Sequence, residues 1–386
     1  LSALGLVNVL GRGKAAIAPR LFAGDASGLV LEEGWLPSRP ARVGRVAEPL
    51  PEVPSQFWRD DSRNSRILLA AVEELQEPLE QALSRWGRGR IGVVLGTSTS
   101  GMATGEAAVA EHLRQGAFPP EYHHQQQQIG RPAPFLAEVL GLRGPAWTIS
   151  TACTSSGRAL VSAWNLLEAG LCDAVVAGGV DSLSGVTLNG FTALEATALE
   201  RTNPMSVNRR GINIGEGAAL FLVQRAEAPL ALLGVGESSD AYHISSPDPT
   251  GAGVIQVLRQ ALEGHDGSPC YLNLHATGTL KNDAMEAAAV QAVFPDGVAC
   301  SGTKPLTGHL LGAAAATELA FGWLTLDPMW NPEGRLPPHI WDGAQDPALP
   351  TLDLVEPGRA LGEIRTVLSS SMAFGGNNLC LRIARA

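Results

Sequence analysis

The sequence predicts an α/β protein in which helices cover both faces of its β-sheets. Four short runs are apolar throughout instead of alternating, a pattern typical of strands that are buried on both faces. Helix-forming stretches lie between these runs, and this alternation indicates layers of helices around sheets. The strands are predicted at residues 91–96, 174–179, 218–223 and 366–370, and the helices at 65–74, 157–169, 254–262, 283–293 and 312–326.

Length and composition bound the kind of protein. A chain of 386 residues predicts two domains or one large duplicated domain. Hydrophobic residues make up 45% and charged residues 17%, which predicts a soluble globular protein with a large core. No apolar run reaches the roughly 18 residues of a membrane span. With 28 basic and 38 acidic residues, the net charge of −10 argues against nucleic acid or an anionic membrane as the main partner.

The five cysteines are scattered and contain no CxxC pair. This pattern predicts neither a disulfide framework nor a zinc site, and it favours a reducing cytoplasm. The adjacent histidines His123 and His124 point in different directions on any regular element, so we expect no metal there. No GxGxxG follows a predicted strand and opens a helix with an acidic residue downstream, and no Walker A sequence is present, which argues against nicotinamide, flavin and ATP as cofactors.

The chain divides loosely near residues 227–234, which predicts an N-terminal half at 1–229 and a C-terminal half at 230–386. Both halves end in a glycine-rich strand turn, AVVAGGVDSL in the first and TVLSSSMAFGGNN in the second. This similarity indicates an internal duplication. Two proline-rich stretches, 39–56 and 331–357, are expected to be surface loops.

Cys153 lies in TISTACTSSGRAL, where a strand-forming run gives way to a helix-forming one. The unsatisfied N–H groups and the dipole of a helix N-terminus stabilise a thiolate, so this position is expected to lower the pKa of Cys153. A packed, unreactive cysteine is the alternative, because most buried cysteines are inert. These residues by themselves leave both readings open.

Two histidines occupy similar settings at the ends of predicted strands. His275 lies in YLNLHATGT, and His309 follows Lys304 in GTKPLTGHLLG. Strand ends are where α/β folds place their functional sites. Taken singly, each is more often a hydrogen-bonded structural histidine, but two histidines in similar strand–loop settings, with Lys304 close by, favour a functional role.

These residues, in this order and context, make the sequence resemble the β-ketoacyl-acyl-carrier-protein synthases of the decarboxylating, two-histidine type in the thiolase superfamily. The resemblance covers nearly the whole chain. It rests on GLRGPAWTISTACTSSGRAL, DAVVAGGVDSL, RRGINIGEGAALFLV, SSDAYHISSPDP, YLNLHATGTLKND, GTKPLTGHLLGAAAATE and SSSMAFGGNN.

The resemblance implies a thiolase-like, duplicated five-layer α-β-α-β-α sandwich, normally dimeric, that joins an enzyme-bound acyl chain to malonyl on acyl carrier protein. It needs no resident cofactor, because phosphopantetheine arrives on the carrier. By this resemblance Cys153 accepts the acyl group, while His275 and His309 donate hydrogen bonds to the enolate oxygen. The resemblance further implies that Lys304 holds the hydrogen-bond network and that Glu318 is a structural or electrostatic partner. It implies an oxyanion hole from the N–H groups of Cys153 and Phe374, a gating role for Phe374, and contacts of Thr277 and Thr279 with the phosphopantetheine arm.

Some positions depart from the family pattern. Ala276 replaces the glycine that usually follows the first histidine, and Asn377 replaces a threonine. The run His123–Gln128 stands where relatives carry mainly apolar residues near the dimer contact and the end of the acyl pocket. It is either a surface loop or part of a pocket suited to a polyene or polyketide chain. Fatty-acid elongation and a secondary pathway therefore both stay open.

Other members of the superfamily are less consistent with the sequence. A thiolase would carry a second cysteine near the C-terminal glycine turn, whereas Cys380 lies in the last predicted strand. The type that starts on acyl-CoA would carry asparagine in place of His309. A non-catalytic chain-length-factor-like subunit of a ketosynthase heterodimer remains the alternative, although such subunits typically lack the cysteine.

Acyl carrier protein is the expected partner, in a homodimer or in a heterodimer with a chain-length-factor subunit. Because the carrier is acidic, its docking calls for a local basic patch. Arg59, Arg63 and Arg66 are the predicted docking residues, with Arg63 and Arg66 on one helix face if a helix begins there. Ordinary solvated arginines are the alternative.

Overall fold

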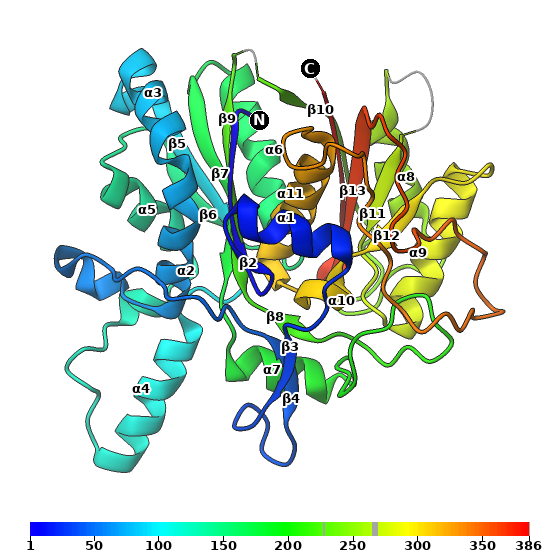
Figure 1. Cartoon of the computed structure of the whole chain (residues 1–386). Helices are drawn as coiled ribbons and strands as arrows, with labels where there is room; N and C mark the ends of the chain where they lie inside the picture. The colour runs from blue at the N-terminus through cyan, green and yellow to red at the C-terminus, as the bar shows by residue number, and fades with distance from the viewer. Residues whose placement is uncertain (227, 265–268, 386) are drawn as a thin grey trace.

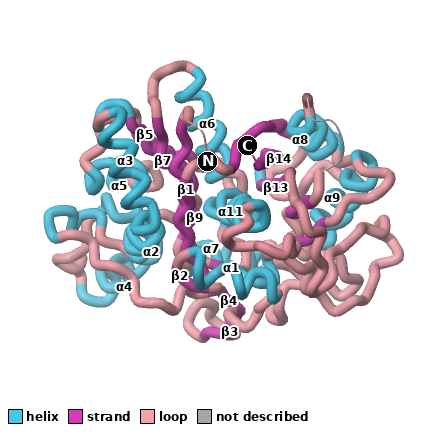
Figure 2. Tube along the Cα trace, turned by 45° about the horizontal axis from the view of Figure 1, so that its top comes forward, coloured by secondary structure: helices cyan, strands magenta, loops and turns pink. Residues whose placement is uncertain are grey.

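The protein is a stack of five alternating layers of helices and sheets. A computed structural model describes residues 1–226, 228–264 and 269–385. Two large sheets stand side by side with helices between them and on both outer faces, as Figure 1 and Figure 2 show. The predicted five-layer α/β architecture is therefore confirmed.

The first sheet has six strands in the order β2-β1-β9-β7-β5-β6. Its strands β5 and β7 are buried along their whole length, as their uninterrupted apolar runs predicted. The strands are β1 (Ala3–Asn8), β2 (Gly11–Arg12), β5 (Ile91–Gly96), β6 (Ala146–Ile149), β7 (Ala174–Asp181) and β9 (Gly217–Gln224).

The second sheet has five strands in the order β10-β14-β13-β11-β12. Strand β11 is parallel to both of its neighbours, and β14 is antiparallel to both of its own. The strands are β10 (Leu230–Ser239), β11 (Tyr271–Leu274), β12 (Cys300–Gly302), β13 (Thr366–Ala373) and β14 (Asn377–Arg385).

The two sheets repeat one topology. In the first, β1-β9-β7-β5-β6 runs antiparallel, antiparallel, parallel, parallel between successive neighbours. The second sheet has the same directions over β10-β14-β13-β11-β12. A helix follows β6 and another follows β12 before the chain enters β7 and β13, respectively. The internal similarity noted in the sequence is thus a duplicated fold.

The central layer contains α6 (Ser155–Glu168) and α11 (Ala314–Leu326), which pack on each other and against both sheets. Every residue of α11 is buried, and a helix that is apolar on all sides is expected at such a position. The outer face of the first sheet is covered by α2 (Arg63–Val72), α3 (Gln76–Trp86) and α5 (Pro132–Leu140), and that of the second by α8 (Ala252–Leu262) and α9 (Leu280–Val293).

Among the remaining elements, α4, α7 and a small sheet lie at the lower side of the molecule in Figure 1, and α1 crosses in front of the two large sheets. Helix α4 extends away from the body of the molecule there, and a small three-stranded sheet lies beside α7. These elements are α1 (Lys14–Ala23), α4 (Met102–Gln115), α7 (Gly185–Ala193), α10 (Lys304–Thr307), β3 (Leu29–Glu32), β4 (Ala41–Gly44) and β8 (Ile214–Gly215), with 3-10 turns η1 (Ser55–Asp60), η2 (Glu73–Leu75), η3 (Arg88–Arg90), η4 (His124–Gln127), η5 (Leu311–Ala313) and η6 (Phe374–Gly376).

All nine predicted elements are present, and their ends differ from the prediction by at most three residues. The two proline-rich stretches are less superficial than predicted. The first contains β4 and the buried Val46. The second contains the buried His339 and Val355, which are joined by a backbone hydrogen bond of 2.8 Å. Side chains in each stretch are buried against neighbouring parts of the fold, so proline content alone was not enough to predict an exposed loop.

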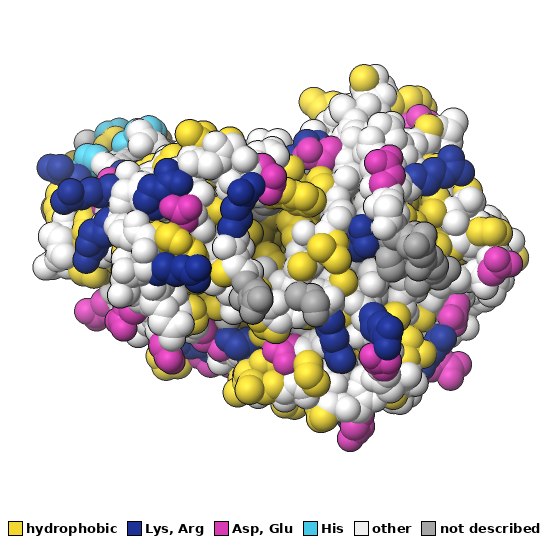
Figure 3. All heavy atoms as spheres, turned by 90° about the horizontal axis from the view of Figure 1, so that it is seen from above, with side chains coloured by type: hydrophobic (Ala, Val, Ile, Leu, Met, Phe, Trp, Pro, Cys, Tyr) yellow, Lys and Arg dark blue, Asp and Glu magenta, His cyan; other side chains and the backbone are white. Residues whose placement is uncertain are grey.

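On the face that is uppermost in Figure 1, basic and acidic side chains are interspersed, as Figure 3 shows. Among the described residues, no helix is both long and apolar enough to cross a membrane.

Candidate active site

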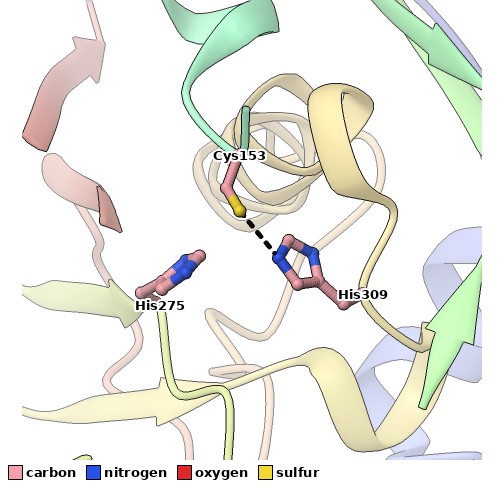
Figure 4. A group of neighbouring side chains, drawn as sticks. All are labelled: Cys153, His275 and His309. Atoms are coloured by element: carbon pink, nitrogen blue, oxygen red, sulfur yellow. Dashed lines mark hydrogen bonds between the residues drawn. The ribbon is translucent and has the colours of Figure 1, made fainter. Parts of the chain in front are cut away.

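Cys153, His275 and His309 converge between the two halves of the molecule. Figure 4 shows the cysteine at the start of α6, His275 at the end of β11, and His309 in the segment that follows α10. Their sulfur and ring nitrogen atoms lie within 4.8 Å of one another, and all three residues are buried. The two imidazole rings are nearly perpendicular, with centroids 5.4 Å apart.

A tight turn holds Cys153 in front of α6. Ala152 has a φ of 52°, in the left-handed region that few residues other than glycine adopt. The Ser155 hydroxyl accepts a hydrogen bond from the Thr151 N–H at 2.9 Å and donates one to the Ala152 carbonyl. The Cys153 sulfur is thereby placed 3.0 Å from Nε2 of His309.

Burial raises the pKa of Cys153 to about 11. The Lys304 charge and the backbone N–H groups of Phe374 and Cys153 lower this pKa, but they do not offset the loss of hydration. The expectation that the helix N-terminus would lower the pKa is therefore wrong for the resting site. The thiol at rest holds its proton, and a thiolate must be stabilised as the reaction forms it.

The neighbouring strand β8 fixes the backbone of His309. The His309 N–H donates to the Asn213 carbonyl at 2.7 Å, and its carbonyl accepts from the Gly215 N–H at 3.0 Å. Nδ1 of the ring accepts from the Leu311 N–H at 3.2 Å. A nitrogen that accepts carries no proton, so the proton of the neutral ring is on Nε2, which faces the sulfur.

His275 has the same tautomer for a different reason. Its Nδ1 accepts from the Lys304 ammonium at 3.3 Å, which leaves the proton on Nε2. Burial lowers the pKa of both histidines well below the ordinary value, and the Lys304 charge lowers each further. Both rings are therefore neutral, and each presents an N–H to the space beside the sulfur.

This arrangement suits an oxyanion better than a metal ion. A metal would need the lone pair of each Nε2, which requires the proton to move to Nδ1. On His275 that proton would face the Lys304 ammonium, and on His309 it would face the Leu311 N–H. Two N–H donors beside a thiol instead match a carbonyl oxygen on which negative charge develops.

Lys304 and Glu318 form a buried ion pair behind His275, with exposed fractions of 1% and 3%. The same ammonium also donates to the His275 carbonyl. A buried charge needs both a counter-charge and hydrogen bonds, and Lys304 has them. The pair is therefore placed to fix the tautomer and position of His275.

Phe374 lies in the turn between β13 and β14, and its ring is 36% exposed. It packs on Phe191 of α7 with ring centroids 5.4 Å apart. The next residue, Gly375, donates its N–H to the Ile244 carbonyl at 2.8 Å, which ties this turn to the loop after β10. Asn377, the departure from threonine, is the first residue of β14 and pairs with Ala373.

Thr277 and Thr279 follow His275 directly, and their hydroxyl oxygens lie 2.9 Å apart. Thr277 is 8% exposed and Thr279 is half-buried. The assignment of these residues to the phosphopantetheine arm stays a prediction.

Two buried carboxylates support the site and were missed by the sequence analysis. Glu286 on α9 accepts the His275 and Ala276 N–H groups at 2.7 and 2.8 Å. Asp181 at the end of β7 accepts hydrogen bonds from the Thr97–Thr99 segment and, at 3.2 Å, from the Ala313 N–H near the start of α11. Their only sequence signal is an acidic residue within an apolar stretch.

The predicted docking arginines interact with other side chains of the same molecule. Helix α2 does begin at Arg63, but this side chain forms an ion pair with Glu216, which is fully buried. Arg66 pairs with Asp61 at 2.7 Å, and Arg59 lies over the ring of Trp58. Their role in carrier docking stays a prediction, and the charges of Arg63 and Arg66 are compensated by carboxylates.

The histidine and glutamine run 123–128 folds against α4. Gln126 is 5% exposed, and its side chain bonds the His123 N–H and the Glu121 carbonyl. The Gln128 carbonyl accepts from the Ser100 hydroxyl at 3.1 Å. Only Gln126 of the run is buried, and whether the run serves as a surface loop or as part of a pocket stays a prediction.

The comparisons with known proteins agree with this geometry. The model of the β-ketoacyl synthase N-terminal domain matches residues 48–228, and that of the C-terminal domain matches residues 231–335. Nodulation protein E of Rhizobium meliloti is 30% identical over 334 residues, which span 82% of this chain and 81% of that protein. The chloroplastic 3-oxoacyl-[acyl-carrier-protein] synthase I of Arabidopsis thaliana is 28% identical over 408 residues, spanning 98% and 84%.

Among solved structures, the chain is similar to a chain of the complex between the ketosynthase ApeO and its chain length factor ApeC from Xenorhabdus doucetiae. The identity is 41%, the match covers 100% of this chain and 97% of the other, and the TM-score is 0.94. The ishigamide ketosynthase/chain length factor, at 23% identity and a TM-score of 0.87, shares the fold. The chain therefore belongs to the β-ketoacyl synthase family of acyltransferase-class condensing enzymes.

Proposed function

We propose that the protein is a 3-oxoacyl-[acyl-carrier-protein] synthase that holds its acyl chain on Cys153 and condenses it with malonyl on acyl carrier protein. One observation carries the proposal. Both imidazoles have Nδ1 occupied as an acceptor and present Nε2–H beside a buried thiol. This combination of a sulfur nucleophile and two neutral donors supports both halves of the reaction.

The first half is thioester exchange. The Cys153 sulfur attacks the acyl carbonyl on the carrier, a new sulfur–carbon bond forms, and the carrier thiol leaves with the proton that Cys153 loses. The raised pKa of the resting thiol means that the thiolate needs stabilising as it forms. The His309 Nε2–H at 3.0 Å from the sulfur and the backbone N–H groups of Cys153 and Phe374 supply that stabilisation.

The second half is decarboxylation followed by carbon–carbon bond formation. The malonyl carboxylate leaves as carbon dioxide, and its bonding electrons pass into an enolate at the thioester carbonyl. His275 and His309 donate Nε2–H hydrogen bonds to the enolate oxygen, where the charge develops. The enolate carbon then attacks the acyl carbonyl on Cys153, whose sulfur leaves and takes up a proton from water.

We further propose a second ketosynthase-like chain, a chain-length-factor subunit, as the dimer partner. The 41% identity to a chain of a ketosynthase and chain length factor complex supports this. Strand β6 ends the first sheet and exposes Trp147, and α4 exposes Leu113, so both could be covered by another chain. We place the protein in the cytoplasm, without a resident cofactor, in fatty-acid or polyene/polyketide-type synthesis.

The test is acyl transfer followed by mass spectrometry. The chain, alone and coexpressed with a candidate partner subunit, is incubated with acyl carrier proteins that carry saturated and unsaturated thioesters of several lengths. We expect acylation of the peptide that contains Cys153. The Cys153→Ala variant should lose it, while Cys172→Ala, which removes another buried cysteine, should keep it. If no donor acylates Cys153 in either preparation, the non-catalytic alternative is correct.

A further inference from the structure

One buried carboxylate, that of Asp181, joins the segment after β5 to the turn that follows His309. Asp181 is the last residue of β7 and is fully buried. Its Oδ1 accepts the Thr99 N–H at 2.7 Å, and it accepts the hydroxyl groups of Thr97 and Thr99 at 2.7 and 2.8 Å. These contacts anchor the carboxylate in the N-terminal half of the molecule.

The second carboxylate oxygen, Oδ2, contacts the C-terminal half. It accepts the Ala313 N–H at 3.2 Å, and the same N–H also donates to the Leu310 carbonyl at 3.0 Å. A Cβ on Gly312 would lie only 2.8 Å from Oδ2. The turn η5 therefore lies directly against Asp181.

This turn is strained, and it contacts the ring of His309. Leu311 has a φ of 51°, in the left-handed region, although it is not a glycine. Strained backbone of this kind persists only where the surrounding contacts hold it. The Leu311 N–H donates to Nδ1 of His309, which leaves the ring proton on Nε2, beside the Cys153 sulfur. The conformation of one residue thus selects the tautomer of the histidine.

We propose that Asp181 is a positioning residue that fixes the tautomer of His309. Its carboxylate holds η5 in the conformation in which the Leu311 N–H reaches Nδ1. The proposal rests on the proposed function, since it assigns a further residue to the same site. The contacts run from Asp181 to Ala313, through the turn to Leu311, and end on the ring that faces the thiol in Figure 4.

The tautomer decides how His309 acts on the thiol. With its proton on Nε2, the ring donates to the sulfur or to an enolate oxygen, and the thiol keeps its own proton. With its proton on Nδ1, the Nε2 lone pair faces the sulfur at 3.0 Å. Nε2 then accepts the S–H proton, which gives a thiolate and an imidazolium. Loss of the Asp181 contact should therefore make Cys153 more reactive and decarboxylation slower.

The tautomer is read directly by NMR on protein that carries ¹⁵N-labelled histidine, with the His309 signals assigned by their loss in His309→Asn. In the wild type we expect an unprotonated Nδ1 and a protonated Nε2. In Asp181→Asn the remaining oxygen should keep the place of Oδ1, where more donors gather, so that the amide N–H groups face the Ala313 N–H. Two donors that face each other separate, and we expect the Nδ1–H form of His309 to appear.

Reactivity gives a second readout. Alkylation of Cys153 by iodoacetamide, followed by mass spectrometry at several pH values, should be about tenfold faster in Asp181→Asn near neutral pH, because the thiol pKa falls. Decarboxylation of malonyl on holo-acyl carrier protein should be about 100-fold slower, the usual effect of losing one oxyanion donor. The other titratable groups around the thiol, Lys304, Glu318 and His275, are unchanged in the variant. A simple loss of packing would slow both reactions.

A second variant disturbs the same contact from the other side. The methyl group of Gly312→Ala would lie 2.8 Å from Oδ2 of Asp181 and 2.7 Å from the Ser98 nitrogen, so it should displace η5 from the carboxylate. The tautomer of His309 should change in the same direction as in Asp181→Asn. If Asp181→Asn does not fold, this variant decides the role of the contact.

The matched control is Glu74→Gln. The Glu74 carboxylate also accepts backbone N–H groups from other segments, those of Leu6 and Lys14, both at 3.1 Å. Its substitution should lower the melting temperature and leave the His309 tautomer and the alkylation of Cys153 as in the wild type.

The outcomes are distinguishable. An unchanged His309 tautomer in Asp181→Asn, or in Gly312→Ala if the first variant does not fold, overturns the role of Asp181. A wild-type ring that carries its proton on Nδ1 also overturns it, as does equal slowing of alkylation and decarboxylation. Absence of Cys153 acylation in the wild type overturns the proposed function, whereas the NMR and alkylation results still decide whether Asp181 fixes the tautomer.

Discussion

At the scale of single residues, Ala276 and Gly302 depend on each other. Ala276 has a φ of 43°, in the left-handed region where the family usually has glycine. Its methyl group points at Gly302, where a Cβ would lie 2.3 Å from that of Ala276. Among the described residues other than its chain neighbours, no other atom lies within 3.4 Å of that position, so the methyl added beside His275 is accommodated because β12 carries glycine opposite it.

A double-mutant cycle tests this dependence. Gly302→Ala should lower the free energy of unfolding by about 1–3 kcal/mol, because two methyl groups would overlap. Ala276→Gly should have a small effect, since relief of backbone strain offsets the lost methyl contact. In the double variant the cost of Gly302→Ala should largely disappear, giving a coupling of at least about 1 kcal/mol in urea unfolding. Additive effects would show that the two positions are independent.

The residues of the site were largely predictable, whereas their ionisation was not. Cys153, His275, Lys304 and His309 stand in recognisable local contexts, and the structure brings all four together. The pKa of Cys153 depends on burial by segments far away in sequence, which a helix-terminus argument does not include. Local sequence therefore located the nucleophile but gave the wrong direction for its pKa.

At the scale of helices and strands, the position of an element could be predicted from its apolar pattern, whereas the distant partner of a side chain could not. The apolar run of β5 was located to the residue, because a strand buried on both faces has no polar interruption. The inward turn of Arg63 was not predictable, because its partner Glu216 lies 153 residues away. Contacts of this kind come from tertiary packing and leave no local pattern.

Glu286 on helix α9 is a buried tertiary partner of this kind. Burial raises the pKa of Glu286 from its ordinary 4.5 to about 7, although the Ala276 and His275 N–H groups lower it. A carboxyl with a raised folded-state pKa stabilises the fold most at low pH, and this stability is lost as pH rises from 4.5 through 7. Ionisation of Glu286 should therefore lower the free energy of unfolding by about 1–2 kcal/mol as the pH rises from 6 to 8.

The Glu286→Gln variant tests this element. It cannot ionise, so its free energy of unfolding should fall less than that of the wild type between pH 6 and pH 8. At either pH the variant should be less stable, because an amide can accept only one of the two N–H groups that Glu286 accepts. Urea unfolding at both pH values, above the isoelectric point of about 5.3, measures the difference. Parallel pH profiles would contradict the assigned pKa.

At the scale of the whole molecule, the duplicated topology explains how the site is assembled. Cys153 lies between β6 and α6, and His309 lies between the equivalent strand β12 and helix α11. The two residues are 156 positions apart and meet because the halves face each other across the central helices. The repeated glycine-rich turns indicated a duplication, but the pairing of these two loops depends on how the halves pack.

That packing depends on Gly179 in β7. A Cβ at this position would lie 2.5 Å from the Ser156 Cβ on α6 and 2.7 Å from the Gly96 carbonyl oxygen on β5. The Ala313 Cα of the other half is only 3.4 Å away. The carbonyl belongs to a paired strand and cannot move aside, so α6 and the residues before α11 reach the sheet only because Gly179 has no side chain.

Gly179→Ala should therefore separate the two halves at the site. We expect the free energy of unfolding to fall by about 2–3 kcal/mol. Acylation of Cys153 should slow by about 100-fold, since small displacements of catalytic groups have effects of that size. Gly89→Ala is the control, because no atom of the described chain, its own neighbours aside, lies within 4 Å of its Cβ position, and its stability should stay within about 0.5 kcal/mol of the wild type. If the Gly179 variant kept both properties as the control does, α6 could be displaced from the sheet without disturbing Cys153, and the close approach at Gly179 would not be what aligns the thiol with His309.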